Sequence, residues 1–195
     1  MSKTGRLIIL SGPSGVGKST IRDLVMEKSP IPLNLSVSAT TRKPRGQEKH
    51  GVDYYFFTEE EFRTQRENDG FLEYKEVFGK NVWYGTLRSE VEHHLQAGRW
   101  VMLEIDVDGA YDVVKTYPDA ITVFIAPPSL EILEERLRSR GTEAEDAIRN
   151  RLSRAKYEIE RSTFYKYRVV NQDLNRAVDE FCHIIYQENQ AGEKK

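Results

Sequence analysis

Short runs of branched apolar residues alternate along this chain with segments whose apolar residues recur at helical spacing. The apolar runs have the length and composition of strands buried on both faces, as in a parallel sheet. Four such strands are expected, within residues 6–12, 99–107, 120–128 and 167–171. Helical patterns lie between and after them, at residues 18–28, 108–116, 129–139 (with Ser129 as N-cap) and 174–189. Strands that alternate with helices predict an α/β fold in which helices flank a parallel sheet.

Two stretches do not follow this alternation. Residues 36–97 contain short aromatic strand patterns at 53–57 and 70–78, and a helix from Thr58 whose Glu61 completes a capping box. We expect a small α+β insertion there, with Tyr54 and Tyr55 on opposite faces of their strand. Residues 138–162 carry many arginines and acidic residues and continue into a long helical pattern. This segment is either a mobile flap over a site or a solvated pair of helices.

The composition describes one domain of ordinary size. The chain has 195 residues, of which 38% are hydrophobic and 31% charged, with a formal net charge of -2. A net charge so close to zero gives no overall positive field, so nucleic acid is not expected as a partner. Cys182 is the single cysteine, which excludes an internal disulfide framework and a cysteine-based zinc site; a small buried thiol is expected.

The N-terminus lacks a secretory signal pattern, and no run approaches the ~20 apolar residues of a membrane span. We therefore expect a cytoplasmic protein without a membrane partner. No obligatory protein partner is evident either.

The segment Gly-Pro-Ser-Gly-Val-Gly-Lys-Ser at residues 12–19 matches the phosphate-binding pattern G-x-x-x-x-G-K-[ST]. It follows a predicted strand and opens a predicted helix, which is the context that this motif requires. Its glycines allow a tight turn whose backbone N–H groups face an anion, and the helix N-terminus adds its positive dipole end. Lys18 is expected to contact the β- and γ-phosphates, and the Ser19 hydroxyl to ligate Mg²⁺. The chain is therefore expected to bind a nucleoside triphosphate.

The motif leaves the phosphoryl acceptor open, because GTPases, motor ATPases and small-molecule kinases share it. A GTPase would carry a base-reading N-K-x-D segment, which this sequence lacks. The acceptor has to be identified from residues outside the loop.

Several separated segments of the chain resemble guanylate kinases. They are, in order, SGPSGVGKST, SVSATTRKPR, GVDYYF, GFLEY, YGT, EIDVDG, IAPPS, SRGTE and VVN. The resemblance spans residues 5–187 and rests on the joint order of these segments. It implies a P-loop kinase with a three-layer α/β/α core (5–35, 98–135 and 163–189), a small α+β GMP-binding insertion (36–97) and a helical lid (136–162). The implied activity is transfer of the γ-phosphoryl group of ATP to GMP, and to dGMP, with Mg²⁺ as cofactor, in purine nucleotide metabolism.

The resemblance also implies residues for the acceptor. The phosphate of GMP would be held by Arg42, Arg45, Tyr54 and Tyr84. Arginines offer forked, permanently charged donors to a dianion, and phenols complete the shell without an added charge. Guanine would be read by Ser38, Glu73, Thr86 and Asp106. Carboxylates match the N1–H and amino donors of guanine and hydroxyls can donate to O6, whereas adenine presents an unprotonated N1 to a carboxylate.

On the donor side, the resemblance implies lid arginines that stabilise charge on the transferred phosphoryl group, namely Arg136, Arg140 and Arg151. Asn171 matches a residue close to the adenine of ATP. The catalytic set is expected to be Lys18, Arg42, Arg140 and Arg151. The donor-nucleotide site is expected to contain Gly12, Ser14, Gly15, Gly17, Lys18, Ser19, Thr20, Arg136 and Asn171. Asp106 either reads guanine or supports Mg²⁺ through water, and Lys43 and Arg154 are expected to be solvated.

The chain departs from the common guanylate kinase pattern in two places. It has Asp108 where many members have Gln, which adds negative charge near the site. The loop between Glu73 and Tyr84 is two residues longer than the common form. We expect the register to recover at Tyr-Gly-Thr, residues 84–86, with Trp83 filling the space that the longer loop creates.

Two other functions remain open from the sequence. Guanylate-kinase-like domains of scaffold proteins use the GMP site to hold phosphorylated peptides. They typically lose features of the P-loop or lid, whereas Gly17, Lys18 and Ser19 are intact here. The other is a kinase with a different acceptor, such as another nucleoside monophosphate or a ribose phosphate; Glu73 together with Asp106 favours guanine.

Overall fold

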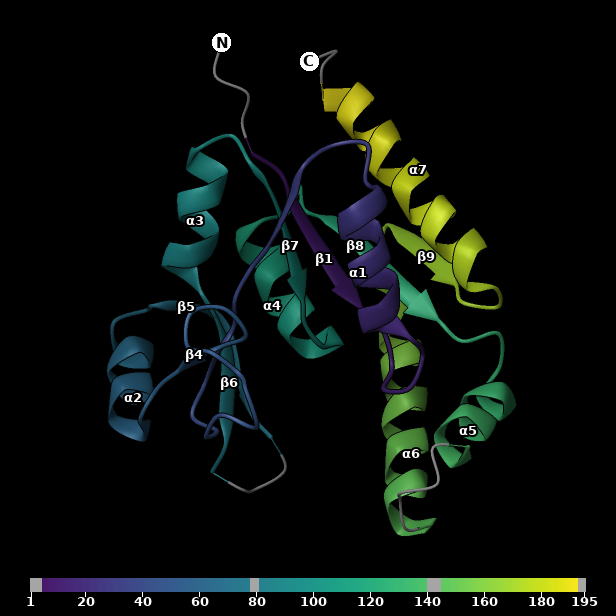
Figure 1. Cartoon of the computed structure of the whole chain (residues 1–195), viewed down its shortest axis with the longest axis horizontal. Coiled ribbons are helices and arrows are strands. Elements are labelled where there is room, and N and C mark those ends of the chain that lie inside the picture. Colours follow the sequence, from purple (N-terminus) through teal and green to yellow (C-terminus); the bar gives the residue numbers. More distant parts are fainter. Residues whose placement is uncertain (1–4, 78–80, 140–144, 193–195) are drawn as a thin grey trace. The chain divides into compact units, whose positions relative to one another are not determined.

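A computed structural model describes residues 5–77, 81–139 and 145–192 of the chain (Figure 1). Within these residues the chain forms two compact units. The first unit contains residues 34–104 and 108–120 together with the N-terminal segment up to residue 7. The second unit contains residues 8–33, 105–107 and those from 121 onward. The predicted boundaries of core, insertion and lid stay predictions.

The second unit is built on strands that run parallel to one another. β1 (Leu7–Ser11) pairs with β8 (Ile121–Ala126), and β8 pairs with β9 (Tyr167–Val170). Every residue of β1 and β8 is buried, which explains why these strands are continuous apolar runs rather than alternating ones. They belong to a five-stranded sheet of order β2-β7-β1-β8-β9, of which β7 (Trp100–Glu104) and most of β2 (Leu33–Leu35) are residues of the first unit. The predicted α/β fold is confirmed.

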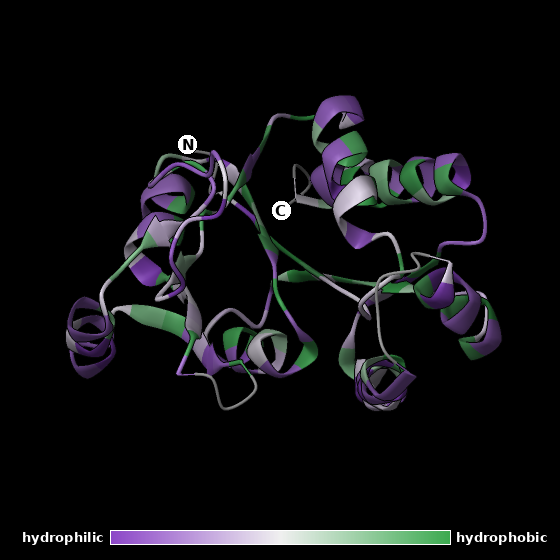
Figure 2. Cartoon of the chain, turned by 60° about the horizontal axis from the view of Figure 1, so that its bottom comes forward, coloured by the Kyte–Doolittle hydropathy of each residue, from purple (hydrophilic) through white to green (hydrophobic). Residues whose placement is uncertain are grey.

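The helices combine apolar and polar residues, green and purple in Figure 2, as amphipathic helices do. Those of the second unit are α1 (Lys18–Lys28), α5 (Leu130–Arg138), α6 (Glu145–Arg161) and α7 (Leu174–Gly192), with a 3₁₀ turn at Ser162–Phe164. α1 packs against α7, and α5 packs against α6. The predicted N-cap of α5 is confirmed, because Ser129 Oγ accepts from the backbone N–H of Ile132 at 3.2 Å.

Cys182 on α7 is only partly buried, so it is less enclosed than expected. Burial still raises the pKa of its thiol above the ordinary value. Within the described residues, no helix combines the length and the apolar character that crossing a membrane requires.

The first unit is built on a four-stranded sheet of order β4-β3-β6-β5. The strands are β3 (Ala39–Thr40), β4 (Tyr55–Phe56), β5 (Phe71–Glu76) and β6 (Trp83–Leu87). β3 is parallel to β4 and antiparallel to β6, and β5 is antiparallel to β6. The helices of this unit are α2 (Glu59–Glu67), α3 (Arg88–Gln96) and α4 (Val107–Thr116), the last of which begins in the second unit. Mixed strands with helices give the α+β character expected for this region.

One face of the four-stranded sheet is apolar. Successive residues of a strand point to opposite sides, so every second residue shares a face. Ala39, Phe71 and Leu87 are buried together with Phe62 of α2, and Trp83 packs against this cluster. We call this side the apolar face. Trp83 is only partly buried against this cluster, and the prediction that it fills the space of the longer loop stays a prediction, because residues 78–80 lie outside the described residues.

The opposite side, which we call the polar face, carries the chemistry-bearing residues. Directly opposed across β5 and β6 are Glu73 with Thr86 and Lys75 with Tyr84. The pairing shifts by one residue between Phe71 and Glu73. This irregularity lets β5 bury Phe71 on the apolar face and still present Glu73 on the polar face.

The sequence analysis missed the short strands β2 and β3 as well as β6 and α3. Gly85 lies in the middle of β6, and glycine weakens a strand pattern because it has no side chain to pack. The structure gives the reason for this glycine. A Cβ added there would come within 2.9 Å of the Phe71 ring and 3.0 Å of the Glu73 carbonyl oxygen, so only glycine lets the two strands approach this closely.

Two other local predictions are confirmed. The Thr58 side chain accepts from the backbone N–H of Glu61, and the Glu61 carboxylate accepts from the backbone N–H of Thr58, which completes the capping box of α2. Tyr54 contacts the ring of Tyr84, whereas the Tyr55 hydroxyl donates to Glu90 at 2.9 Å. The two neighbouring tyrosines therefore face opposite sides.

We predict that Phe62→Ala destabilises the protein by about 3–5 kcal/mol, because it leaves a cavity under the apolar face. Phe62 is 2% exposed and stacks on Phe71 at 4.4 Å between ring centroids. Urea denaturation measures the change. Val52→Ala, at a position 68% exposed in the same unit, is the control and should change the free energy of unfolding by less than about 0.5 kcal/mol. Equal effects of the two substitutions would contradict the packing described.

Candidate functional site

The glycine-rich segment between β1 and α1 forms a hollow at the N-terminus of α1. Its lining residues are Pro13, Ser14, Gly15, Gly17, Lys18, Ser19 and Thr20. The Lys18 ammonium donates to the carbonyl oxygen of Gly12 at 3.2 Å, so the side chain folds back along the loop. Backbone N–H groups at a helix start, a lysine and a hydroxyl are the groups that bind phosphate oxygens. The predicted donor-site residues of this segment are therefore brought together.

Gly17 holds the turn into α1 in a conformation that other residues rarely adopt. It is the N-cap of the helix with φ 92° and ψ 19°, in the left-handed region. An added Cβ would lie 2.7 Å from Nδ2 of Asn171. Both the backbone and its neighbour therefore require glycine here.

Asn171 supports the loop from behind. It is 7% exposed, and its side-chain amide donates to the carbonyl oxygen of Val16 at 2.7 Å. The backbone carbonyl oxygen of Asn171 accepts a hydrogen bond from Nη2 of Arg136, on α5, at 2.9 Å. Asn171 and Arg136 therefore stabilise the conformation of the loop. A contact of Asn171 with the adenine of ATP stays a prediction.

α6 carries arginines towards the same loop. Arg151 donates to the Ser14 hydroxyl at 3.3 Å. Arg140, the remaining predicted lid arginine, lies outside the described residues.

Arg154, one turn beyond Arg151, is not the solvated side chain that we expected. Its Nε donates to Glu158 at 3.0 Å, and its Nη2 donates to Asp106 at 3.1 Å. Glu158 is 7% exposed, and burial raises the pKa of its carboxyl, while the charge of Arg154 acts in the opposite direction. An unpaired charge at this depth would be costly, so Arg154 has a structural reason to be there. It also fixes the orientation of Asp106.

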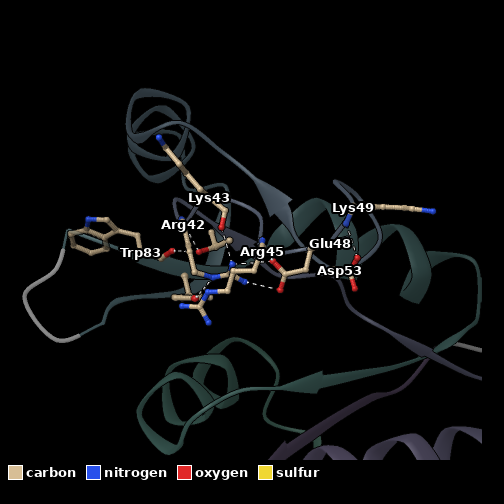
Figure 3. A network of polar contacts seen from close by, with 9 residues as sticks. Arg42, Lys43, Arg45, Glu48, Lys49, Asp53 and Trp83 are labelled. Atoms are coloured by element: carbon tan, nitrogen blue, oxygen red, sulfur yellow. Dashed lines mark hydrogen bonds and ion pairs between the residues drawn. The ribbon is translucent and has the colours of Figure 1, made fainter.

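The polar face of the first unit contains Arg42, whose guanidinium is held in one orientation (Figure 3). Nη1 and Nη2 donate to the two carboxylate oxygens of Glu48 at 2.9 and 3.0 Å, and Nε donates to the Tyr84 hydroxyl at 3.0 Å. The bond to Glu48 is the main reason that the pKa of Arg42 is raised. Arg42, and the backbone N–H of Arg45 at 2.7 Å, in turn lower the pKa of Glu48. This fork is the geometry in which arginine binds two oxygens of an anion.

The predicted register at residues 84–86 is confirmed at Tyr84, because its hydroxyl meets Arg42 rather than pointing away. Part of the longer loop, residues 78–80, lies outside the described residues. Arg45 and Lys43 are exposed, and Figure 3 shows the Lys43 side chain directed away from the Arg42–Glu48 pair. Lys43 is solvated, as expected.

Tyr54 completes the surroundings of Arg42. Its ring centroid lies 5.4 Å from the Arg42 guanidinium carbon and 5.8 Å from the Tyr84 ring. Burial, and then the neighbouring Tyr84 phenol, raise the pKa of Tyr54, so its hydroxyl stays a neutral donor. An arginine flanked by two phenols is the arrangement predicted for an acceptor phosphate.

Glu73 and Thr86 form the other end of the polar face. The Thr86 hydroxyl donates to Oε1 of Glu73 at 2.6 Å. On its other side Glu73 touches the first turn of α4, where a Cβ added at Gly109 would lie 2.7 Å from Oε2. Ser38 directly precedes Ala39 of β3 and is half-buried. The carboxylate predicted to read a base is thus held between a hydroxyl and a helix N-terminus.

Asp108, the departure noted in the sequence, has a partner. Its Oδ2 accepts from the Lys75 ammonium at 2.9 Å. The extra negative charge at this position is therefore balanced within the same unit.

The sequence analysis did not predict several of the contacts that hold the site residues in place, and it treated Arg154 as solvated. Lys75 follows Glu73 by two residues on a predicted strand, so the period of two could have identified it. Arg154 and Glu158 are four residues apart on a predicted helix, which is the spacing of an ion pair. Glu48 had no such signal, because it lies in an irregular loop whose path the sequence does not give.

The residues around the hollow fit a Mg²⁺ ion that would take most of its ligands from phosphate and water. Among the described residues, no group of three or more His, Cys, Asp or Glu side chains is placed to hold a metal ion. Ser19 lines the hollow beside Lys18. A single hydroxyl is sufficient for Mg²⁺, which keeps most of its ligands as water and substrate oxygens.

Comparisons with known proteins agree with this geometry. A family model described as Guanylate kinase matches residues 4–188. A guanylate kinase from Rhodopirellula baltica is 48% identical over 182 residues, covering 93% of this chain and 87% of that protein, and one from Synechocystis sp. is 46% identical, covering 96% of each. The crystal structure of guanylate kinase from Anaplasma phagocytophilum has a TM-score of 0.75 and 33% identity, covering 96% of this chain and 87% of that one. The chain therefore belongs to the guanylate kinase family of enzymes.

Proposed function

We propose that this protein transfers the γ-phosphoryl group of ATP to GMP, giving ADP and GDP. The observation that carries the proposal is the polar face of the first unit. It brings an arginine flanked by two phenols and a carboxylate paired with a hydroxyl onto one surface. A nucleoside monophosphate with a guanine base presents the matching groups, a dianion at one end and two N–H donors at the other.

ATP would bind through the hollow at the start of α1. The backbone N–H groups of the loop and the Lys18 ammonium would hold its phosphates, and Arg151 is already directed at the loop through Ser14. Mg²⁺, held by the Ser19 hydroxyl, would neutralise negative charge on the phosphates when bound.

The acceptor phosphate would bind at Arg42, with Arg45, Tyr54 and Tyr84 around it. The Arg42 guanidinium makes paired bonds to the two oxygens of Glu48, and a phosphate would bind this fork by taking the place of that carboxylate. Because the attacking oxygen of GMP is itself ionised, the reaction needs no catalytic base. Catalysis would then rest on positioning and on cations that stabilise the transferring group.

Guanine would be selected by Glu73. The Thr86 proton is directed at Oε1 of Glu73, which keeps this carboxylate an acceptor towards the base. Guanine offers N1–H and an amino group to it, whereas adenine would place a lone pair against it. Ser38 and Asp106 are the further base-reading residues of the proposal, which extends to dGMP as acceptor and to purine metabolism in the cytoplasm.

A panel of acceptors tests the proposal. ADP release would be measured in a coupled assay with ATP and Mg²⁺ and with GMP, dGMP, AMP, UMP or CMP. We expect turnover with GMP and dGMP and little with the others. Turnover with a different monophosphate would overturn the acceptor assignment. No turnover with any, together with tight binding of a phosphorylated peptide, would favour the noncatalytic module instead.

We predict that Lys18→Met lowers kcat by at least about a hundredfold, because it removes a cation from the transferring phosphates. The melting temperature should change by less than about 2 °C, since a single partly exposed charge at the start of a helix contributes little to folding. Lys28→Met, at the other end of α1, is the matched control and should keep normal kcat. Retained kcat in the Lys18 variant would contradict the loop assignment.

We predict that Glu73→Gln raises the KM for GMP about 10- to 100-fold, because a charged hydrogen-bond acceptor is lost at the base. The KM for ATP should stay unchanged, and the ratio of GMP to AMP turnover should fall. Steady-state kinetics with each substrate varied in turn measures both constants. Glu76→Gln is the matched control, because Glu76 lies opposite Trp83 on β5 and so faces away from the polar face. A parallel rise of both KM values would argue that Glu73 acts on the fold rather than on the base.

A further inference from the structure

Lys75 lies on the polar face among the residues proposed to bind the acceptor. It is directly opposite Tyr84 across the β5–β6 pair, and it follows Glu73 by two residues on the same strand. Side chains paired in this way share one face of a sheet and lie within about 5 Å of each other at Cβ. The ammonium group of Lys75 is therefore a cation beside the proposed acceptor site.

Asp108 approaches the same surface from α4. It lies in the first turn of this helix, next to Gly109, whose Cα packs against the Glu73 carboxylate. A carboxylate at this point is favourable for the helix, because it faces the positive dipole end. It is unfavourable for an anionic acceptor, since it adds to the charge of Glu73.

The ammonium of Lys75 and the Asp108 carboxylate are joined at 2.9 Å. Their side chains are 40% and 31% exposed. Ion pairs with this exposure contribute little to folding stability, because solvent screens them and their ordering costs entropy. A pair of this kind can still change the local potential felt by a bound dianion.

We propose that Lys75 and Asp108 form a charge-balancing pair that sets the affinity of the polar face for its anionic acceptor. The inference rests on the proposed function, and Lys75 acts in it as a positioning and electrostatic residue rather than a catalytic one. Lys75 cancels the charge of Asp108 and holds this carboxylate away from the acceptor. Asp108 in turn keeps the ammonium next to Glu73 and Tyr84 instead of in solvent.

The test is a double-mutant cycle with Lys75→Met and Asp108→Asn, measured by calorimetric titration of GMP without ATP or Mg²⁺. Methionine keeps most of the lysine stem, and asparagine keeps the shape of the carboxylate. Lys75→Met should weaken GMP binding about three- to tenfold, as Coulomb's law gives for one unit charge within about 10 Å of a dianion. Asp108→Asn alone should leave the Kd unchanged or lower it by up to about threefold. The double variant should return to within about twofold of the unsubstituted protein.

Ionic strength and a matched ion pair separate this role from a structural one. The deficit of Lys75→Met should shrink by at least about half between 50 mM and 500 mM NaCl, because salt screens a charge effect. Lys115→Met removes a lysine that pairs with Asp112 at 2.7 Å on α4, with side chains 60% and 57% exposed. It should leave the Kd for GMP unchanged.

Several results would overturn the proposal. They are a Lys75→Met variant with normal Kd, a deficit that does not respond to salt, and a double variant as weak as Lys75→Met alone. If instead the unsubstituted protein does not bind GMP, or does not phosphorylate it in the acceptor panel, the proposed function fails first. The two failures are therefore distinguishable.

Discussion

The turn that joins β1 to α1 is the constraint on which the rest of the second unit depends. Gly17 reaches the left-handed region at φ 92°, and the carbonyl of Val16 just before it is held by the Asn171 amide. Asn171 is in turn held by Arg136. A residue that follows β9 and a helix side chain thus fix a segment with three glycines, which would otherwise have many conformations. These contacts orient the backbone N–H groups of the loop before an anion binds.

In the first unit, the comparable constraint is the alternation of side chains between the two faces of short strands. Because β6 packs Trp83 and Leu87 against the core on one face, it presents Tyr84 and Thr86 on the other. A slip of one residue would exchange the two sets, so the buried aromatic cluster fixes the register of the polar face. Packing on one side of the sheet and recognition on the other are therefore not independent.

The sequence predicted the parallel strands, most helices and the phosphate-binding loop because their signals are local. Apolar runs, caps and the spacing of glycines with Lys18 and Ser19 need no knowledge of distant residues. β6 was not predicted because Gly85 interrupts its strand pattern. This glycine is required by the close approach of Phe71 and Glu73 on β5. Among the site residues, Arg42 and Tyr84 were expected from the family resemblance, but their 3.0 Å bond depends on pairing across 42 residues of chain. Long-range pairing is what a single sequence does not give.

The residues whose structural role the sequence analysis did not predict share one property, which is that they hold a charge in place. Glu48 orients Arg42, Arg154 joins Glu158 to Asp106, and Asp108 holds Lys75. A phosphoryl-transfer site concentrates cations that repel one another, so each needs a fixed partner to keep its direction before the substrates arrive. Such partners belong to no motif, because any carboxylate within reach will serve. Their identity follows from the fold of this particular chain, which is where one member of a family can adjust its affinity without altering the residues that define the family.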